Sequence, residues 1–291
     1  MRVDRQIMEL AKADWLMSIG GVTAYAKIVH SIMSGTSAPI AEKTHALVTI
    51  IDSNGIRVGR NSDGELKIPK GSVAIVDMIG PVMKYGDWCS YGAEEIVDAL
   101  KRADDDDNII GTIFNVDGPG GSVSSIGPFI EFAKNKKKPI VGLADQCASL
   151  HFWAFCEVAD FRMATNNVSS SFGSVGVVSS FADNTKYLET LGYVFHEIYP
   201  KESEHKNLAY TLALKGDYDM IKEEHLSPIA RKFQASVARN CPNLKADEVG
   251  VLTGKMFDAD KALELGMIDA IGSMSQAIDR IKIMSELHHY T

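Results

Sequence analysis

The stretch Asp-Gly-Pro-Gly-Gly at residues 117–121, with Asp-Gln-Cys-Ala-Ser-Leu-His at residues 145–151, decides the fold predicted for this chain. The glycine turn ends an apolar run at 109–116, and Ser149 follows a second apolar run at 139–144. Both runs are typical of buried strands, and the residues after Ser149 are typical of an apolar helix. A serine at such a junction lies beside backbone N–H groups without helical partners, and a glycine turn can supply another. This arrangement suits acyl transfer.

From residue 72 onward, strand-like apolar runs alternate with amphipathic segments. The strands are predicted at 73–79, 109–116, 139–144 and 161–164, and the helices between them at 91–103, 122–135 and 148–158. Such alternation is typical of an α/β fold in which helices cover a parallel sheet. The later elements are predicted as a helix at 181–191, a strand at 193–199, a long helix at 218–240, short strand, helix and strand over 254–272, and a last helix at 275–288.

The first seventy residues have a different pattern. Helical spacing appears at 3–18 and 21–34, and Gly20-Gly21 separates the two segments. A short strand is predicted at 48–51, and Asn54-Gly55 and Asp63-Gly64 are turn signals. We interpret residues 1–70 as an N-terminal appendage and residues 71–291 as the main domain.

Composition excludes several classes of function. The hydrophobic content of 45% and charged content of 23% are those of an ordinary globular protein. A net charge of −8 without a basic stripe argues against a nucleic-acid partner. Four cysteines without a CxxC pair predict neither a disulfide scaffold nor a zinc site, and favour a reducing compartment. The charged N-terminus lacks a signal peptide, and the apolar stretch 15–33 contains Lys27 and His30, so we expect a cytoplasmic protein without a membrane span.

Ser149 needs a base to remove its proton. His151 lies roughly 200° around a helix axis from it and cannot reach the hydroxyl. His196, His205 and His225 stay open as members of a Ser-His-Asp triad, although no acid near them has an evident orienting role. A lysine is the other option, and burial must lower its pKa from ~10.4 toward ~7. The residues alone do not choose among the lysines.

Five ordered segments of the chain resemble one family. They are 73–76 through Gly80-Pro81-Val82, residues 115–123, Cys147-Ala148-Ser149 with Ala159-Asp160, residues 172–177, and residues 254–257 through 262–269. In this order and spacing, over about residues 72–272, the chain resembles the serine–lysine peptidases of the signal peptide peptidase A type, peptidase family S49. The phage prohead protease branch is the most similar.

The resemblance implies a role for each matching residue. Ser149 would be the nucleophile, and Lys206 in Glu204-His205-Lys206 the base, with Lys201 in reserve. Ser174 would orient the lysine amine. The oxyanion hole would use the N–H groups of Leu150 and of Gly121, or of its neighbour Gly120. No metal or organic cofactor is implied. The carboxylates of Glu202 and Glu204 would have to face solvent, because nearby acids oppose a neutral lysine.

Two departures from the family pattern stand near the nucleophile. Gly118 replaces the serine that usually precedes Pro-Gly-Gly. Leu150, His151, Phe152 and Trp153 follow Ser149 where the family has small residues. Such bulk would narrow the substrate pocket or pack against a neighbouring subunit, but it leaves the Leu150 N–H in place.

By this resemblance we expect the Clp protease/crotonase-like α/β superfold and a homo-oligomer. The implied activity is that of an endopeptidase that hydrolyses a polypeptide through an acyl-enzyme on Ser149. Maturation of a phage or prophage capsid, with capsid or scaffold proteins as partners, is the first expectation. Degradation of signal peptides, an acyl-CoA hydratase or isomerase on the same fold, and an inactive structural protein are the alternatives.

Overall fold

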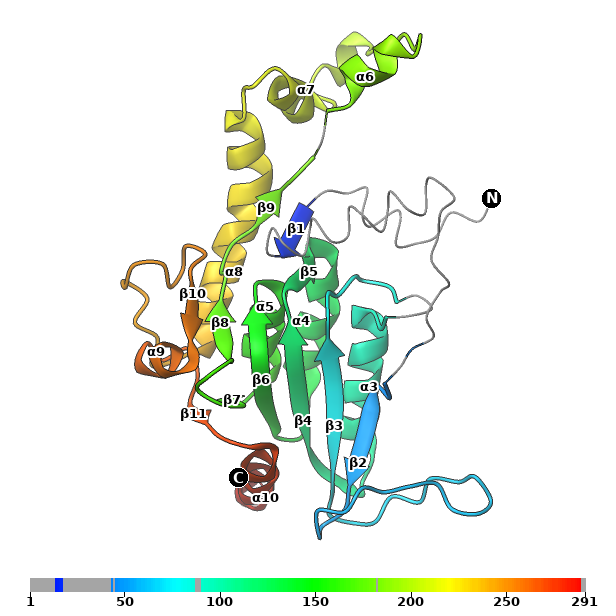
Figure 1. The fold of residues 1–291 in the computed structure, drawn as a ribbon, viewed down its shortest axis with the longest axis vertical. Helices are drawn as coiled ribbons and strands as arrows, with labels where there is room; N and C mark the ends of the chain where they lie inside the picture. Colours follow the sequence, from blue (N-terminus) through cyan, green and yellow to red (C-terminus); the bar gives the residue numbers. More distant parts are fainter. Residues whose placement is uncertain (1–13, 18–42, 44, 87–89, 182, 289–291) are drawn as a thin grey trace.

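A mixed sheet forms the centre of the molecule (Figure 1). The computed structural model describes residues 14–17, 43, 45–86, 90–181 and 183–288. Strands β3 (Ser72–Ile79), β4 (Ile109–Gly118) and β6 (Ile140–Ala148) lie side by side in parallel, and β2 (Val48–Ile51) pairs antiparallel with β3 at the edge. Residues 48–51, within the predicted appendage, are therefore part of the main sheet.

Beyond β6 the sheet divides between two partners. The first half of β6 pairs in parallel with β7 (Phe161–Ala164), and its last residues pair with β8 (Ser171–Gly173). Strand β10 (Met256–Asp258) pairs antiparallel with β8, and β11 (Ala270–Ile271) pairs in parallel with β7. The C-terminal end of β6 thus lies between β4 and β8, and Ser149 follows that end.

Helices cover both faces of the sheet. On one face lie α3 (Ala93–Asp105), η1 (Val123–Ser125) with α4 (Ile126–Asn135), and α5 (Leu150–Val158), as Figure 1 shows. Helix α10 (Met274–His288) lies on the other. The alternation of side chains along β4 matches these layers, since Phe114 packs with Phe129 of α4 whereas Ile113 packs in the cluster that contains Ile281 of α10. The predicted α/β architecture, with helices on both faces of a parallel central sheet, is confirmed.

A long excursion leaves this body after β9 (Val178–Ser179). It contains α6 (Thr185–Thr190), η2 (Lys201–Ser203) and α7 (Leu208–Leu214), and returns through the π-helical turn η3 (Ile221–Leu226) and α8 (Ser227–Asn240). We call residues 183–220 the arm; in Figure 1, α6 and α7 lie at the end of α8 that is distant from the sheet. The strand predicted at 193–199 is wrong for this single chain. Those residues are exposed and irregular, because a strand needs a partner strand.

The N-terminal stretch is described only at residues 14–17. They form strand β1 (Asp14–Met17), which pairs antiparallel with β5 (Gly120–Ser122) and with β9. The predicted helix at 3–18 is therefore wrong at these four positions; its other residues and the helix predicted at 21–34 lie outside the described residues. The last third of the chain is completed by α9 (Ala259–Glu264) between β10 and β11. Among the described residues, no helix combines the length and hydropathy needed to cross a bilayer.

Candidate active site

Ser149 occupies a sharp turn between β6 and α5. Its φ of 58° and ψ of −116° lie outside the regions that non-glycine residues ordinarily adopt. The Ser149 N–H donates to the Gly173 carbonyl oxygen at 2.9 Å, and its own carbonyl accepts the first helical bond, from Trp153 N–H at 3.0 Å. Backbone strain of this kind persists only where the surroundings hold it, and it clusters at functional sites. Ser149 is therefore a strong candidate nucleophile.

Aromatic packing fixes the helix that starts at Ser149. Helix α5 is buried on nearly every side. The Trp153 ring stacks on Phe233 of α8, with centroids 4.7 Å apart and planes within 5° of parallel. Phe152 and Phe155 both contact Phe172 of β8, with centroids 6.5 and 6.1 Å apart. The bulky residues after the nucleophile thus anchor α5 to its neighbours in the same chain.

The two residues predicted to supply oxyanion donors, Gly121 and Leu150, pack against each other. Leu150 is the first residue of α5, where backbone N–H groups have no partner within the helix. A Cβ atom placed on Gly121 would overlap the Val82 carbonyl oxygen and lie 2.6 Å from Leu150 Cδ2. The glycine turn is held there by two hydrogen bonds, Val82 N–H to Gly120 O and Ser122 N–H to Val82 O, both 3.1 Å. Only glycine fits at position 121, and the turn is packed directly against the start of α5.

Ser174 is also brought to this region. It directly follows Gly173, whose carbonyl accepts from the Ser149 N–H. Its φ is 56°, and its N–H donates to the Lys255 carbonyl oxygen at 3.0 Å. The strained backbones of Ser149 and Ser174 are therefore linked through one residue, as expected for two hydroxyls that serve one site.

The predicted lysines are not assembled with Ser149 within the chain. Lys201 and Lys206 are exposed on the arm, between α6 and α7, and Figure 1 shows this part of the chain well away from the end of β6. Among the described residues neither amine has a carboxylate partner. The imidazole of His205 lies 3.8 Å from a Glu204 carboxylate oxygen, and both are exposed. The described part of a single copy thus brings together the candidate nucleophile and the predicted oxyanion donors, but neither predicted lysine.

The histidine alternative gains no geometric support. His196 and His205 are exposed on the same arm, and His225 lies in η3, where its ring contacts that of Tyr210 at 5.9 Å between centroids. His151 is buried under the glycine turn, and burial lowers its pKa to about 3, so it is neutral at physiological pH. The described part of the chain places no histidine against the Ser149 hydroxyl.

His151 explains both departures from the family pattern. A Cβ atom on Gly118 would overlap the His151 Nε2 atom and lie 2.6 Å from the Gly80 carbonyl oxygen. The imidazole therefore occupies the space that a serine side chain at position 118 would need. Gly118 and His151 are therefore coupled, because the large imidazole fits only when position 118 has no side chain.

The cysteines near Ser149 are structural. Cys147 and Cys156 are buried, as expected, and burial raises the pKa of both thiols. The Cys156 and Cys241 sulfur atoms lie 3.6 Å apart and join α5 to the end of α8. Deeply buried, protonated thiols are poor nucleophiles, so neither Cys147 nor Cys156 competes with Ser149.

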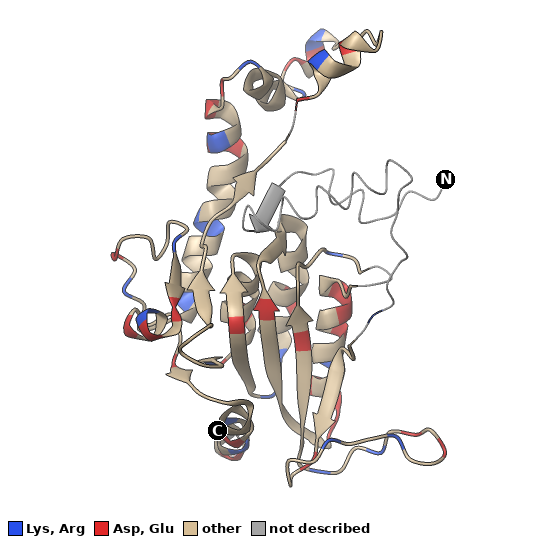
Figure 2. Ribbon diagram, viewed as in Figure 1, with Lys and Arg blue, Asp and Glu red and all other residues tan. Residues whose placement is uncertain are grey.

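Carboxylates at the ends of the central strands have partners in the protein. Strands β3, β4 and β6 each contribute one, seen as red bands in Figure 2: Asp77, Asp117 and Asp145. Asp77 accepts from Asn115 Nδ2 at 2.8 Å, and burial raises its pKa. Asp145 accepts from the Ser169 and Ser170 hydroxyls at 2.8 and 3.0 Å. No group of three metal-ligating side chains occurs in the described ranges.

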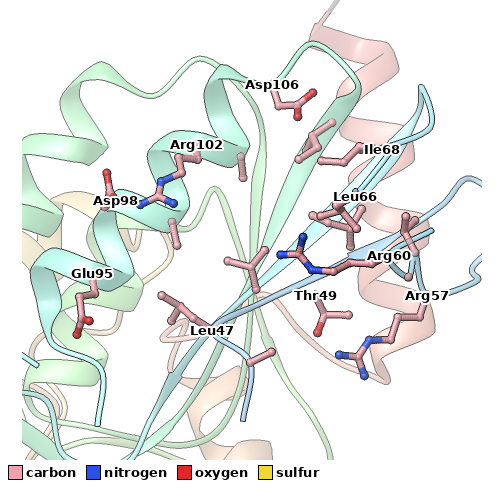
Figure 3. A pocket seen from close by; sticks show the side chains of 18 residues that line it. Leu47, Thr49, Arg57, Arg60, Leu66, Ile68, Glu95, Asp98, Arg102 and Asp106 are labelled. Atoms are coloured by element: carbon pink, nitrogen blue, oxygen red, sulfur yellow. Dashed lines mark hydrogen bonds and ion pairs between the residues drawn. The ribbon is translucent and has the colours of Figure 1, made fainter. Parts of the chain in front are cut away.

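A cavity among the described residues lies away from Ser149. It has a volume of about 940 Å³ and is bounded by β2, the irregular segment 57–68 and α3. Figure 3 shows Arg57, Arg60 and Arg102 around it with apolar side chains such as Leu47 and Leu66. None of the residues assigned to catalysis lines it. Its volume therefore says nothing about the chemistry at Ser149.

The sequence missed a feature beside the nucleophile. Strands β5, β1 and β9 form a separate three-stranded sheet with β1 in the middle. Gly120 and Gly121 belong to β5, and β9 begins four residues after Ser174. The strand that lies between them comes from residues that were predicted to be helical, and periodicity gave no signal for it.

Comparison with known proteins identifies relatives over the same region. A putative signal peptide peptidase SppA of Enterococcus faecium is 25% identical over 66% of this chain and 56% of its own length. The head-tail preconnector protein GP5 of Enterobacteria phage P21 is 24% identical over 70% of this chain and 40% of its own length. The chain thus spans about half of these relatives or less. A solved membrane-bound stomatin-specific protease is 13% identical, with a TM-score of 0.46 over 72% of this chain and 84% of that one.

The family model itself covers more than half of the sequence. The model described as peptidase family S49 matches residues 132–288, which include the whole of α5, Ser174 and the arm. The strained Ser149 and the motifs at 172–177 and 254–269 lie within the match, and the glycine turn at 117–121 precedes it. The chain belongs to peptidase family S49.

Proposed function

We propose that the protein is a serine endopeptidase whose nucleophile is Ser149 and whose base is Lys206 of a neighbouring copy. The observation that carries this proposal is the strained Ser149 backbone, held beside the Leu150 and Gly121 N–H groups. Membership of the S49 peptidase family supports the same chemistry. Paired N–H groups at that position would stabilise the oxyanion of a tetrahedral intermediate.

The exposed surface of the arm supports a base supplied by a second copy. Several large apolar side chains lie uncovered beside the lysines: Tyr193 is 59% exposed, Val194 75%, Phe195 52% and Ile198 91%. Such a concentration of apolar surface is typical of a protein–protein contact. Docking of this arm over a neighbouring Ser149 would bury the lysine and favour its uncharged form. The homo-oligomer expected from the family is thus part of the proposed site.

The proposed reaction needs no group beyond these side chains. The uncharged Lys206 amine accepts the Ser149 proton as the hydroxyl oxygen attacks the substrate carbonyl, and the leaving amine of the peptide then takes that proton. Water, deprotonated by the same amine, hydrolyses the acyl-enzyme and restores the serine. Ser174 would hold the lysine amine in position by accepting a hydrogen bond from it. Lys201 is the reserve base.

For biological role we propose processing of head proteins in the assembly of a phage or prophage capsid. The similarity to a phage head-tail preconnector protein supports it. Peptide degradation of the signal peptide peptidase kind is the second candidate, because a relative of that name matches equally well. Purified capsid or scaffold precursors and synthetic signal peptides, offered in parallel, would distinguish the two by which is cleaved.

Labelling with a fluorophosphonate probe tests the chemistry. The wild-type assembly should become labelled on Ser149, and both Ser149→Ala and Lys206→Ala should abolish labelling, whereas Lys201→Ala should retain it. Labelling that survives Lys206→Ala but fails in Lys201→Ala would move the base to Lys201. Absence of labelling in a folded, assembled wild type would contradict the proposal. An acyl-CoA activity that survives Ser149→Ala would then favour a hydratase or isomerase.

A further inference from the structure

Strand β1 lies in a gap between two strands that border the nucleophile. It pairs antiparallel with β5 on one side, where Leu16 faces Gly121 and Met17 faces Gly120. On the other side it pairs antiparallel with β9, where Trp15 faces Val178 and Asp14 faces Ser179. Figure 1 shows β1 above the ends of the central strands, between β5 and β9.

The partners of β1 are parts of the proposed catalytic machinery. Gly121 and Gly120, opposite Leu16 and Met17, are the residues assigned to the oxyanion hole. Strand β9 continues the segment that contains Ser174. A carbonyl attacked by Ser149 must lie against the oxyanion donor, so the backbone of β1 runs along the line that a scissile peptide would follow.

An extended polypeptide is the natural ligand for such a gap. Two strands that leave an open edge on each side of a site can bind a third strand by main-chain hydrogen bonds, with little dependence on its side chains. Among the strands that the structure describes, β5 and β9 are joined only through β1. Within the described residues, β1 is the strand that fills this gap.

We infer that residues 14–17 occupy the substrate-strand position of their own chain, so that the N-terminal segment competes with polypeptide substrate for the β5–β9 gap. The effect on catalysis rests on the proposed peptidase function. The occupancy of the gap by β1 rests on strand pairing alone. A tethered segment competes at a high effective concentration. Substrate must therefore displace β1 before Ser149 can act, and the N-terminus restrains the peptidase.

Proline at position 16 tests the inference in the full-length chain. Proline lacks a backbone N–H and is excluded from the middle of a sheet, so Leu16→Pro should release β1. Arg5→Pro is the matched control, since it places the same residue in the same terminal segment outside β1. Both are compared with the parent in a Ser149→Ala background, which prevents self-cleavage from altering the sample.

Hydrogen exchange measures occupancy without reference to activity. In the parent and in Arg5→Pro, amides of segments 120–122 and 178–179 should exchange severalfold more slowly than in Leu16→Pro. Equal exchange in all three would overturn the inference, whatever the enzyme does.

Labelling of chains that retain Ser149 measures competition. Leu16→Pro should react with the fluorophosphonate severalfold faster than wild type or Arg5→Pro. A synthetic peptide with the sequence of residues 12–19 should slow that reaction, and the same peptide with proline in place of Leu16 should not. If Leu16→Pro changes hydrogen exchange but is labelled at the same rate as wild type, the claim that the N-terminal segment restrains the peptidase would be overturned. If Leu16→Pro changes hydrogen exchange but no variant is labelled, the claim that β1 occupies the gap would stand and the proposed function would be contradicted instead.

Discussion

Ser149 illustrates which properties of a single residue a sequence reveals. A serine between an apolar strand and an apolar helix predicts a turn at that residue, and the structure places Ser149 in one. Its positive φ could not be predicted, because only glycine signals such a conformation in sequence. The strain depends on contacts from distant segments, such as the hydrogen bond to the Gly173 carbonyl.

The contact between Gly118 and His151 gives a steric prediction. Gly118→Ser should lower the free energy of unfolding by about 1–3 kcal/mol, because the new side chain overlaps the His151 imidazole and the packed interior cannot yield. The loss is measurable by urea denaturation. The rate of fluorophosphonate labelling should fall with it, since the glycine turn must shift.

Removal of the imidazole should rescue that variant. His151→Ala alone leaves a cavity, whereas in Gly118→Ser/His151→Ala the serine occupies the vacated space. The double variant should therefore be more stable than the sum of the two single changes predicts, by about 1 kcal/mol or more. Strict additivity of the two losses would show that the residues do not share this space.

The buried His151 also predicts a dependence of stability on pH. Its pKa of about 3 in the folded chain lies below the ordinary value, so between these values the unfolded chain binds a proton that the folded chain does not. The free energy of unfolding should thus fall as pH decreases below about 6.5. Relative to His151→Phe, the wild type should lose about 2 kcal/mol between pH 7 and pH 5. Parallel pH profiles of the two proteins would mean that the imidazole is hydrated.

At the scale of elements, buried segments were the predictable ones. The strands predicted at 73–79, 109–116 and 161–164 agree with β3, β4 and β7 to within two residues, because continuous burial on both faces gives each a continuous apolar run. Helices α3 and α10 were predicted from their amphipathic spacing. Strand β1 was not, since its four residues lie in a stretch with helical spacing and its conformation depends on partners distant in sequence.

In the arm, a strand was predicted that the structure does not form. Residues 193–199 have the composition of a strand, yet the described part of the chain offers them no partner strand. A strand-like composition indicates a segment that is buried and paired with another strand when the protein functions. This mismatch fits the proposal that a neighbouring copy covers the arm in an assembly.

A charge at the most exposed apolar position of the arm tests this. Ile198→Glu should weaken self-association about tenfold to a hundredfold, because it places a carboxylate in the proposed contact. Val168→Glu is the matched control: both side chains are 91% exposed, but Val168 lies on the body after β7. Mass photometry across a dilution series measures the change. Equal dissociation of the two variants would exclude the arm from the interface.

At the scale of the whole molecule, the parts of the site are distributed over two regions. The body holds Ser149, Leu150 and the glycine turn, while the arm holds Lys206 and Lys201. The sequence predicted both sets through the family motifs, but it could not show that one chain keeps them apart. Under the proposed function, that separation would make assembly a condition for activity, and the gap between β5 and β9 would be the place where substrate and the N-terminal segment compete.

Complementation between two inactive variants tests the shared site most directly. Ser149→Ala and Lys206→Ala chains, distinguished by mass and co-expressed so that they assemble together, each lack one half of the dyad. The account predicts that neither variant alone reacts with a fluorophosphonate, and that the mixed assembly becomes labelled on the Lys206→Ala chains, whose Ser149 is served by a neighbour. A wild type that is labelled, beside mixed assemblies that never are, would contradict it.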